Sequence, residues 1–474
     1  MASVFSADAR KILLRRISEF WFEFRSKRIG LAGLALMLMY AGVAIFAPYL
    51  TPYNPMSQPR LAQAIAMPEW ITVFPQFQEY GRTQRNTLNW QIVAGSDYIK
   101  NWGTTVDIQY AADNPELVQV ALKSHFAYEQ LAPNEFYTKF RYEVTNLTDV
   151  EYSMTLVLTP PDANGSWVFF KSPTLSAARS QDVTADSKDP LFIKLLGYDL
   201  QTNVGNIIFA QRGNYTFTMY LNLRALSGNA EAHILFKEAQ IVLLGRVHGI
   251  LGTDYLAKDI WSHIVWGSRI SLIVGLLAAI VGTAIGIFVG VVSGYLGGMT
   301  DEVLMRTVDI LLCLPLLPLL LALVHLYGRN VYYIVLFIAI FGWQGLARVI
   351  RSQTLSIRET PYIESARASG GSGFYIMRRH IVPNIIPVAF ASMILAVPGA
   401  ILFEAALSFL GFGDPRVVTW GMMLQHAFGF GGFSQLAWWW ILPPGLAIIG
   451  LCLSFVFVGH AFDEIVNPRL RRRR

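Results

Sequence analysis

Two kinds of hydrophobic pattern divide the chain. Near its beginning and through its second half, apolar residues form nearly uninterrupted runs of about 20 residues, the length that a helix needs to cross a bilayer. Between these parts, residues 51–245 carry shorter runs in which apolar and polar side chains alternate. The sequence predicts six membrane-spanning helices, at 29–50, 268–294, 306–327, 331–349, 384–410 and 436–459.

Residues 51–245 are expected to fold as a separate β-rich domain, inserted between the first and second spans. The runs KFRYEV (139–144), YSMTLVL (152–158) and YTFTMYLNL (215–223) alternate as half-buried strands do. Turn-forming residues separate these runs. We expect an antiparallel β-sandwich that builds its own core. N-x-S/T sequons, which are glycosylation acceptors only where the organism has the machinery, occur at Asn146, Asn164 and Asn214.

Basic residues indicate which loops face the cytoplasm, because Lys and Arg concentrate on that side of a membrane protein. Such clusters occur before the first span, over 348–380 and after the last span. Six spans place all three clusters on one side, so both termini are predicted to be cytoplasmic and the insert external. The segment 295–305 fits less well, since it is predicted to be cytoplasmic but carries Asp301 and Glu302.

The amino end is predicted to form an amphipathic helix along the inner membrane surface, because apolar residues recur there at helical spacing with basic residues between them. A soluble helix packed on a partner is the alternative. We therefore expect three parts: 1–50 with this helix and the first span, the insert 51–245, and a membrane core at 246–474. The apolar positions of the amino-terminal helix are Leu13, Ile17, Phe20, Trp21 and Phe24.

Composition supports a membrane protein and argues against several other classes. The chain is 53% hydrophobic and 15% charged, which is more apolar surface than a soluble domain of this size can bury. Its net charge of +6 comes from basic residues beside apolar segments and not from one patch, which argues against nucleic-acid binding. Cys313 and Cys452 lie in apolar runs, and no histidine has metal-binding spacing, so neither a catalytic nor a metal site is predicted.

The membrane part contains three unusual features. Glycines at every fourth position of the second span share one helix face and allow a second helix to approach closely. Pro315 and Pro318 predict a kink in the third span, either beside a moving pathway or fixed by its neighbours. Glu404 is costly in its apolar run and predicts either a hydrogen bond inside the bundle or a role beside a solute pathway. The glycines are Gly282, Gly286, Gly290 and Gly294.

The loop at about 348–383 has the features of a coupling helix. In TPYIESARASG, Thr360 is a candidate N-cap, Pro361 occupies the first helical position, and Gly370, Gly371 and Gly373 permit a sharp turn after the helix. A second helix then leads through FYIMRRHI to Pro383 and the fifth span. A short helix of this kind can insert into a groove on a soluble partner.

These segments resemble the C-type permease subunit of oligopeptide and dipeptide ABC importers. ESARASG followed by HIVPN is similar to the EAA loop of that family, and HGILGTDYLAKDIW, EAALSFLGFG and GHAFDEIVNPRL are similar to further signatures. The resemblance covers about 1–55 and 248–470. It departs from the family at Ser365, at Val382 before Pro383, at Ala257-Lys258, and in the insert, which it leaves unexplained.

The resemblance implies a six-helix type I ABC importer permease, mainly α, with an extra external sandwich-like domain. It implies a second homologous permease, two ATPase subunits and an external solute-binding protein as partners. ATP and Mg²⁺ would bind the ATPase subunits, since this chain has no G-x-x-x-x-G-K-[ST] sequence. The ATPase-docking residues carried over by position are Glu364, Ser365, Ala366, Arg367, Gly370 and Pro383.

The leading interpretation is therefore a translocation subunit for peptides in the plasma (inner) membrane, without enzymatic activity of its own. Oligosaccharides or nickel are alternative solutes within the same mechanism. A membrane receptor that senses a ligand through the external domain is an alternative of another class, but it predicts a cytoplasmic signalling domain that the short inner segments do not provide. A membrane-anchored enzyme would require a catalytic constellation, which the insert does not display.

Overall fold

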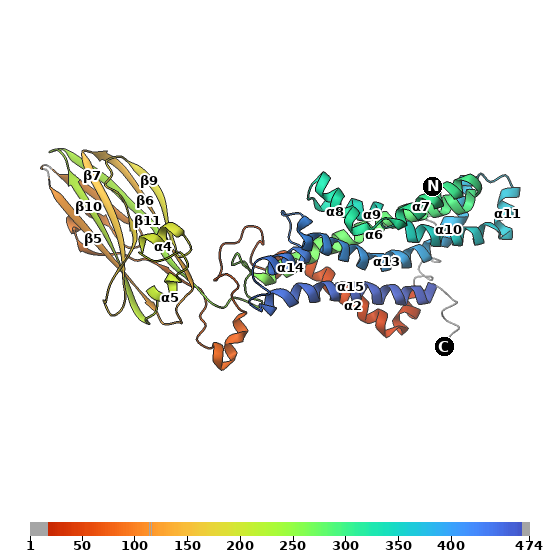
Figure 1. Cartoon of the computed structure of the whole chain (residues 1–474), viewed down its shortest axis with the longest axis horizontal. Helices are drawn as coiled ribbons and strands as arrows, with labels where there is room; N and C mark the ends of the chain where they lie inside the picture. The colour runs from red at the N-terminus through yellow and green to blue at the C-terminus, as the bar shows by residue number, and fades with distance from the viewer. Residues whose placement is uncertain (1–17, 113, 115, 467–474) are drawn as a thin grey trace. The chain divides into compact units, whose positions relative to one another are not determined.

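The computed structural model describes residues 18–466 apart from 113 and 115 (Figure 1). The chain divides into two compact units. One contains the residues up to Gln58 and those from Ile260 onward, and the other is Pro59–Asp259. The predicted amino-terminal helix has two positions outside the described residues, Leu13 and Ile17. The basic residues up to position 16 and from position 469 onward also lie outside them.

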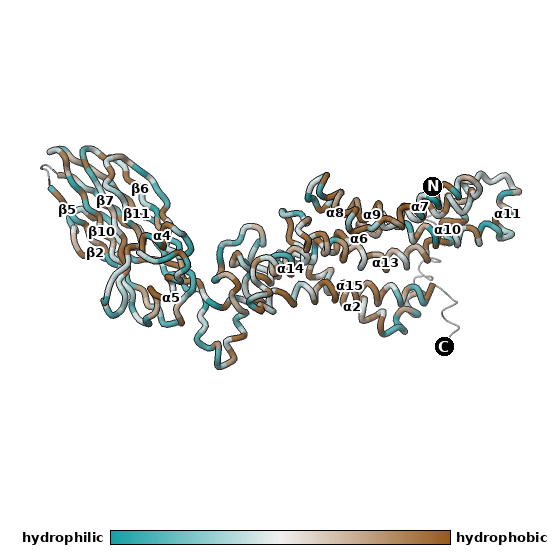
Figure 2. The backbone as a smooth tube through the Cα atoms, in the orientation of Figure 1, coloured by the Kyte–Doolittle hydropathy of each residue, from teal (hydrophilic) through white to brown (hydrophobic). Residues whose placement is uncertain are grey.

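Five helical segments of the first unit are long and apolar enough to cross a membrane. Two of them contain more than one element. α9 (Val331–Ile340) and α10 (Gln344–Arg358) form one segment, and α12 (Gly373–Ile376), a π-helical turn (Met377–Ile381) and α13 (Val382–Leu407) belong to another. Hydrophobic positions, drawn brown, are frequent along α9 and α13 in Figure 2, whereas α10 is more polar. The remaining three are α2 (Arg28–Ile45), α6 (Ile260–Leu296) and α15 (Trp438–Val466).

The predicted third span, 306–327, is not one continuous helix. α7 (Gly298–Cys313) and α8 (Leu316–Tyr327) meet at 87° and count as a sixth span only if the bent pair is taken together. Pro315 causes the break, because it has no N–H to donate and forces the preceding Leu314 into an extended conformation (ψ 132°). Pro318 lies in the first turn of α8, where an N–H has no intrahelical partner, so it adds no second kink.

The amino-terminal helix is described over 18–26 and packs on the last span. Phe24 is buried, and the rings of Phe20 and Phe462 have centroids 5.0 Å apart. Lys27 donates to Glu464 at 2.6 Å just after this helix. Trp21 and Phe22 remain exposed, as an amphipathic helix at a membrane surface requires.

The second unit is a sandwich of two antiparallel sheets, which confirms the predicted fold class. One sheet has the order β3-β4-β11-β6-β9 with β1 beside β11, and the other has the order β2-β5-β10-β7-β8. Each predicted run lies within a longer strand. The strands are β1 (Gln84–Thr87), β2 (Gln91–Ala94), β3 (Ile99–Asn101), β4 (Val106–Ala112), β5 (Leu117–Tyr128), β6 (Glu135–Thr148), β7 (Val150–Thr159), β8 (Trp167–Lys171), β9 (Arg179–Asp186), β10 (Gly213–Ala225) and β11 (Ala230–Leu244).

Aromatic rings fill the space between the two sheets. Phe169 from β8 lies 5.2 Å from Phe217 on β10 and 5.6 Å from Phe136 on β6, measured between ring centroids. The short helices α4 (Pro190–Leu195) and α5 (Val204–Ile208) add Phe192 and Ile208 to this core. Burial of several large rings gives this unit a hydrophobic core of its own.

The second unit begins and ends later than the predicted insert 51–245. Residues 246–259 fold back on 61–69: Leu61 N–H donates to the Ala257 carbonyl at 3.0 Å, and Thr253 Oγ1 donates to the Gln63 carbonyl at 2.7 Å. The LGTD segment, expected at the start of the membrane core, therefore belongs to the base of the β unit, which takes in Pro59–Asp259.

Candidate coupling surface and membrane cavity

The coupling-loop helix α11 (Pro361–Ala368) is fixed to the membrane helices by one face. Ile363 from α11, Ile376 from α12 and Ile381 from the π-helical turn are all fully buried. They form one cluster with Val291 and Tyr295 at the end of α6. Because three separate turns of the loop pack on the same helix end, a force applied to α11 is transmitted to α6 through a close-packed contact.

The rest of α11 is open to solvent. Glu364 and Ser365 are exposed away from Ile363, and Arg367, one turn after Ile363 on the same face, is exposed beside the buried cluster, while Ala366 is half-buried. The Arg367 guanidinium lies 5.8 Å from the centre of the Tyr295 ring, so this exposed cation is oriented by a residue of α6. Gly370 and Pro383 are exposed as well. All six residues predicted for docking thus lie on or beside this one loop.

The turn after α11 is a Schellman motif, which explains the glycines. Gly370 has φ +82°, its N–H donates to the Arg367 carbonyl at 3.0 Å, and Gly371 N–H donates to the Ala366 carbonyl at 3.0 Å. A Cβ at Gly371 would lie 2.8 Å from the Ala366 oxygen. Glycine is therefore required at two successive positions for different reasons. Gly370 has a positive φ that side chains disfavour, and Gly371 has no room for a Cβ.

Thr360 is the N-cap residue of α11, as predicted, but its side chain does not cap the helix. Thr360 occupies the N-cap position with extended backbone, but its hydroxyl donates backwards to the Ile357 carbonyl at 2.6 Å and does not accept from α11. The hydroxyl thus closes the end of α10, while Pro361 at the first helical position starts α11.

An ion pair that the sequence did not predict holds the ends of three helices together. Arg351 on α10 donates from Nε and from an Nη to the two oxygens of Asp301, at 2.5 Å each. Ser293 on α6 also donates to Asp301. The acidic residue that fitted poorly into a cytoplasmic loop is therefore neutralised by an arginine of the predicted basic cluster.

The predicted glycine face of α6 lies against α9 and α10. A Cβ added at Gly290 would be 2.7 Å from the Ala347 oxygen, and one added at Gly294 would be 2.8 Å from Thr354 Cβ. At Gly286 the nearest atoms belong to Leu346, at 3.1 Å. At Gly282 the Ala339 oxygen is 3.5 Å away, so contact loosens toward the break between α9 and α10.

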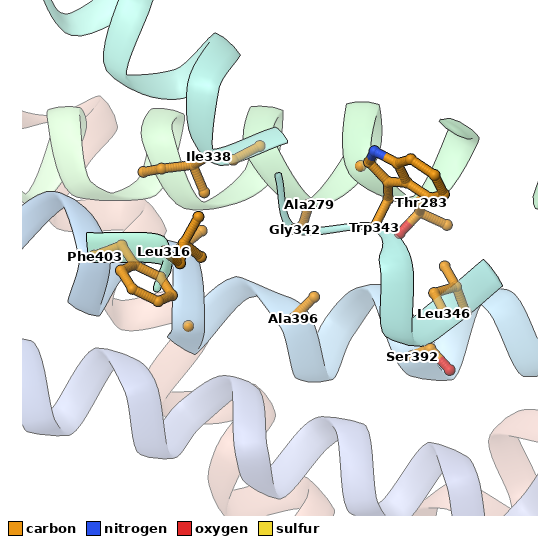
Figure 3. Close-up of a pocket in the computed structure, with 14 residues that line it drawn as sticks. Ala279, Thr283, Leu316, Ile338, Gly342, Trp343, Leu346, Ser392, Ala396 and Phe403 are labelled. Atoms are coloured by element: carbon orange, nitrogen blue, oxygen red, sulfur yellow. The ribbon is translucent and has the colours of Figure 1, made fainter. Parts of the chain in front are cut away.

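A cavity of about 190 Å³ opens where the contact loosens (Figure 3). It lies between α6, α8, α13 and the irregular stretch 341–343 that separates α9 from α10. Its lining is apolar apart from the hydroxyls of Thr283 and Ser392 and the indole of Trp343, and it contains no charged side chain. The lining residues are Ala278, Ala279, Gly282, Thr283, Leu316, Ile338, Gly342, Trp343, Leu346, Ser392, Ala396, Gly399, Ala400 and Phe403.

The other candidate pathway residues lie beside this cavity and not in its lining. Glu404 follows the lining residue Phe403 but is 2% exposed, and its carboxylate accepts from Ser408 Oγ at 2.6 Å and is hydrogen-bonded by Thr419. Pro315 and Pro318 are both exposed, while Leu316 between them lines the cavity. Glu404 is therefore held by hydroxyl groups inside the bundle.

Neither unit contains a metal-binding cluster among the described residues. On the sandwich, the half-buried His233 contacts Asp107 at 2.8 Å and Thr145 at 3.1 Å across three neighbouring strands. Its imidazole is bonded on both nitrogens, as expected for a cross-strand ladder.

Comparison with known proteins follows the same division of the chain. Residues 282–472 match a family model described as the binding-protein-dependent transport system inner membrane component, and residues 16–68 match the N-terminal TM domain of oligopeptide transport permease C. Neither range includes the body of the β unit.

Curated relatives match over the membrane part. The chain is 38% identical over 221 residues to the oligopeptide transport system permease protein OppC of Escherichia coli strain K12, covering 46% of this chain and 72% of that protein. It is 34% identical over 222 residues to the dipeptide transport system permease protein DppC of Bacillus subtilis strain 168, covering 47% and 69%. A solved family 29 carbohydrate-binding module covers 34% of this chain and 92% of its own, but at 10% identity and a TM-score of 0.19 that likeness carries no argument.

Proposed function

The chain belongs to the OppC/DppC-type binding-protein-dependent permeases and is the membrane subunit of an oligopeptide or dipeptide ABC importer, and on that premise we propose that the exposed face of α11 docks an ATPase subunit. The chain is a transporter subunit and not the ATPase. The observation that carries the docking proposal is the division of α11 into two faces. Ile363 is fully buried against the bundle, whereas Glu364 and Ser365 face solvent.

This geometry suits the transfer of force from a motor to the membrane helices. A helix inserted in a groove of the ATPase would move with it, and the buried isoleucines would carry that movement to α6. Arg358 strengthens the connection, because its guanidinium donates to the carbonyls of Gly294 and Tyr295, at 3.3 and 3.2 Å, at the end of α6. The Asp301–Arg351 pair extends the rigid region to α7.

The proposed assembly contains a second homologous permease, two ATPase subunits that bind ATP and Mg²⁺, and an external solute-binding protein. Family membership in a binding-protein-dependent ABC system supports these partners in general terms. The proposed orientation places both termini and α11 in the cytoplasm and Pro59–Asp259 outside. The basic residues around α11 support this orientation through the positive-inside rule.

The cavity beside the glycine face is proposed to be part of the translocation pathway. A lining without charged side chains suits a carrier of peptides, because peptides differ in the charge of their side chains and a fixed charge would reject some of them. Selection among solutes would then rest mainly on the external binding protein.

Purification of the chain in mild detergent, followed by mass spectrometry of its bound partners, tests the docking proposal. We expect ATPase subunits to copurify with the wild-type chain and to be lost from Glu364→Arg, while the second permease remains bound. Glu302→Arg is the control, since Glu302 is an exposed carboxylate on α7 outside the coupling loop. Equal ATPase recovery with Glu364→Arg and Glu302→Arg would exclude this face of α11 as the docking site.

A further inference from the structure

The cavity contains the start of a helix inside the membrane span. α9 ends at Ile340, the irregular stretch 341–343 follows, and α10 begins at Gln344. Trp343 is the N-cap residue and its side chain makes no cap hydrogen bond. Gly342, Trp343 and Leu346 all line the cavity, so the first turn of α10 borders it.

The first turn of a helix attracts negative charge. Its N–H groups have no intrahelical carbonyl to bond, and the aligned peptide dipoles place partial positive charge at this end. α10 is 15 residues long, which is enough for this effect to develop. In water such an end is solvated, but inside a membrane it requires a polar partner that enters the cavity.

A hydroxyl group beside this helix end has no partner of its own. Thr283 on α6 is 8% exposed and lines the cavity next to Trp343 (Figure 3), and its hydroxyl bonds to none of the residues that the structure describes. Other helical threonines in the bundle are satisfied: Thr354 donates to the Ile350 carbonyl at 2.8 Å and Thr307 to the Val303 carbonyl at 3.0 Å. Thr283 is therefore a buried donor aimed into the cavity.

A second hydroxyl lies on another wall of the same cavity. Ser392 on α13 lines it and likewise bonds to none of the described residues. The site thus offers backbone N–H groups and two hydroxyl groups from three helices. A carboxylate accepts several hydrogen bonds at once and matches this set, whereas an ammonium group would need acceptors and would be repelled by the helix end.

We propose that the Thr283 hydroxyl, the first turn of α10 and Ser392 form a transit site for the C-terminal carboxylate of a peptide as it crosses the membrane. This inference rests on the proposed pathway role of the cavity. The absence of an arginine or lysine from the lining fits transit, because neutral donors hold a carboxylate weakly enough to release it. A conducted solute must bind well enough to enter a site and weakly enough to leave it.

Uptake of two matched peptides tests the site. The importer is purified with its partners and reconstituted in liposomes, and initial ATP-driven uptake is measured for radiolabelled tetra-alanine and for its C-terminal amide at saturating binding protein. The ratio of the acid rate to the amide rate is then compared between wild-type and Thr283→Val. The wild-type and variant importers are measured with the same binding protein. Any preference of that protein for the acid or the amide therefore affects both ratios equally and cancels when they are compared. We expect Thr283→Val to lower the ratio at least threefold.

Two further variants keep the test decisive. Thr354→Val is the control, because it removes a buried hydroxyl from α10 that bonds its own helix and does not line the cavity, and it should leave the ratio unchanged. Ser392→Ala should lower the ratio in the same direction and carries the test if Thr283→Val does not assemble. An unchanged ratio, or equal slowing of both peptides, would overturn the carboxylate site. Failure of the wild-type importer to take up either peptide would instead overturn the proposed function, and this inference with it.

Discussion

Arg351 and Asp301 are 50 positions apart in the chain and form a two-pronged ion pair at the end of the membrane bundle, with both hydrogen bonds at 2.5 Å. The pair joins α10, which leads to the coupling helix, to the first turn of α7. Ser293 of α6 adds a third hydrogen bond to the same carboxylate. A single carboxylate therefore fixes three helices at the point where force from a motor would enter.

We predict that Arg351→Ala lowers the free energy of unfolding by about 1–2 kcal/mol, because it removes charge-assisted hydrogen bonds from a partly buried carboxylate. Thermal unfolding of the purified protein measures this. Arg348→Ala is the matched control: Arg348 pairs with Asp309 on the same two helices, but both side chains are about half exposed, so its loss should cost less than about 1 kcal/mol. Equal losses for the two variants would show that the Asp301 pair has no special role.

Close packing of α6 on α10 gives the second prediction. Gly290→Ala places a methyl group 2.7 Å from the Ala347 oxygen and from Ile350 Cβ, so the helices must separate. We expect a loss of about 1–3 kcal/mol in unfolding free energy and a reduced uptake rate. Gly42→Ala in α2 is the control, since an added Cβ there meets nothing within 4 Å and the substitution should be neutral or stabilising. Normal stability of Gly290→Ala would mean that this contact is loose in the protein.

Local patterns in the sequence predicted some features and not others, for physical reasons. Alternation in β6, β7 and β10 reports burial of one sheet face, and the spacing of Gly282 to Gly294 reports one helix face, so both can be recognised from a few neighbouring residues. The pairing of Asp301 with Arg351 depends on how α7 and α10 pack, and no local pattern contains it. Proline chemistry predicted a kink at Pro315, but it did not predict that the bend would reach 87°.

The cavity shows the same limit. Thr283, Ser392 and Trp343 come from different helices and have no common spacing in the sequence, so only the packed bundle brings them together. The break before Gln344 has no proline to signal it, and the run 331–349 therefore predicted a continuous span. Thr360 had the residue type of a helix cap, but its hydroxyl found a nearer acceptor on the preceding turn.

The base of the β unit is predicted to depend on pH through Asp254. This carboxyl is buried and accepts from the N–H groups of Leu256 and Lys258, each at 2.9 Å, and burial raises its pKa from 3.8 to about 6. The folded protein therefore holds the proton more tightly than the unfolded chain does. Its contribution favours folding at low pH and is lost as the pH rises from about 4 to 6.

Asp254→Asn should remove that dependence. The amide oxygen can still accept both backbone hydrogen bonds and carries no charge to bury, so we expect the variant to be more stable than wild-type by about 1–3 kcal/mol above pH 6 and similar at pH 4. Thermal unfolding at pH 4.5 and pH 8 measures the difference. A variant that is destabilised at pH 8 but not at pH 4.5 would show that the carboxylate is needed in its charged form, and equal destabilisation at both pH values would show that Asp254 acts through contacts that do not depend on its protonation.

The last prediction concerns the inserted sandwich, which the family comparison leaves unexplained. Thr83 and Gly245 stand where the chain enters and leaves the sheets, and the Gly245 N–H donates to Thr83 Oγ1 at 3.0 Å. A short Gly-Ser turn can therefore replace residues 84–244 and leave the base segments, with their hydrogen bonds between Leu61 and Ala257 and between Gln63 and Thr253, in place.

We propose that the sandwich docks the solute-binding protein or shields the external mouth, since it is attached at both ends between the first and second spans. The shortened chain should then fold and assemble normally, because the sandwich has its own core. Uptake into liposomes at increasing concentrations of binding protein should show a half-saturating concentration raised severalfold if the sandwich docks that protein, and an increased passive leak of peptide if it shields the mouth. The same affinity, rate and leak as in the full-length importer would exclude both roles.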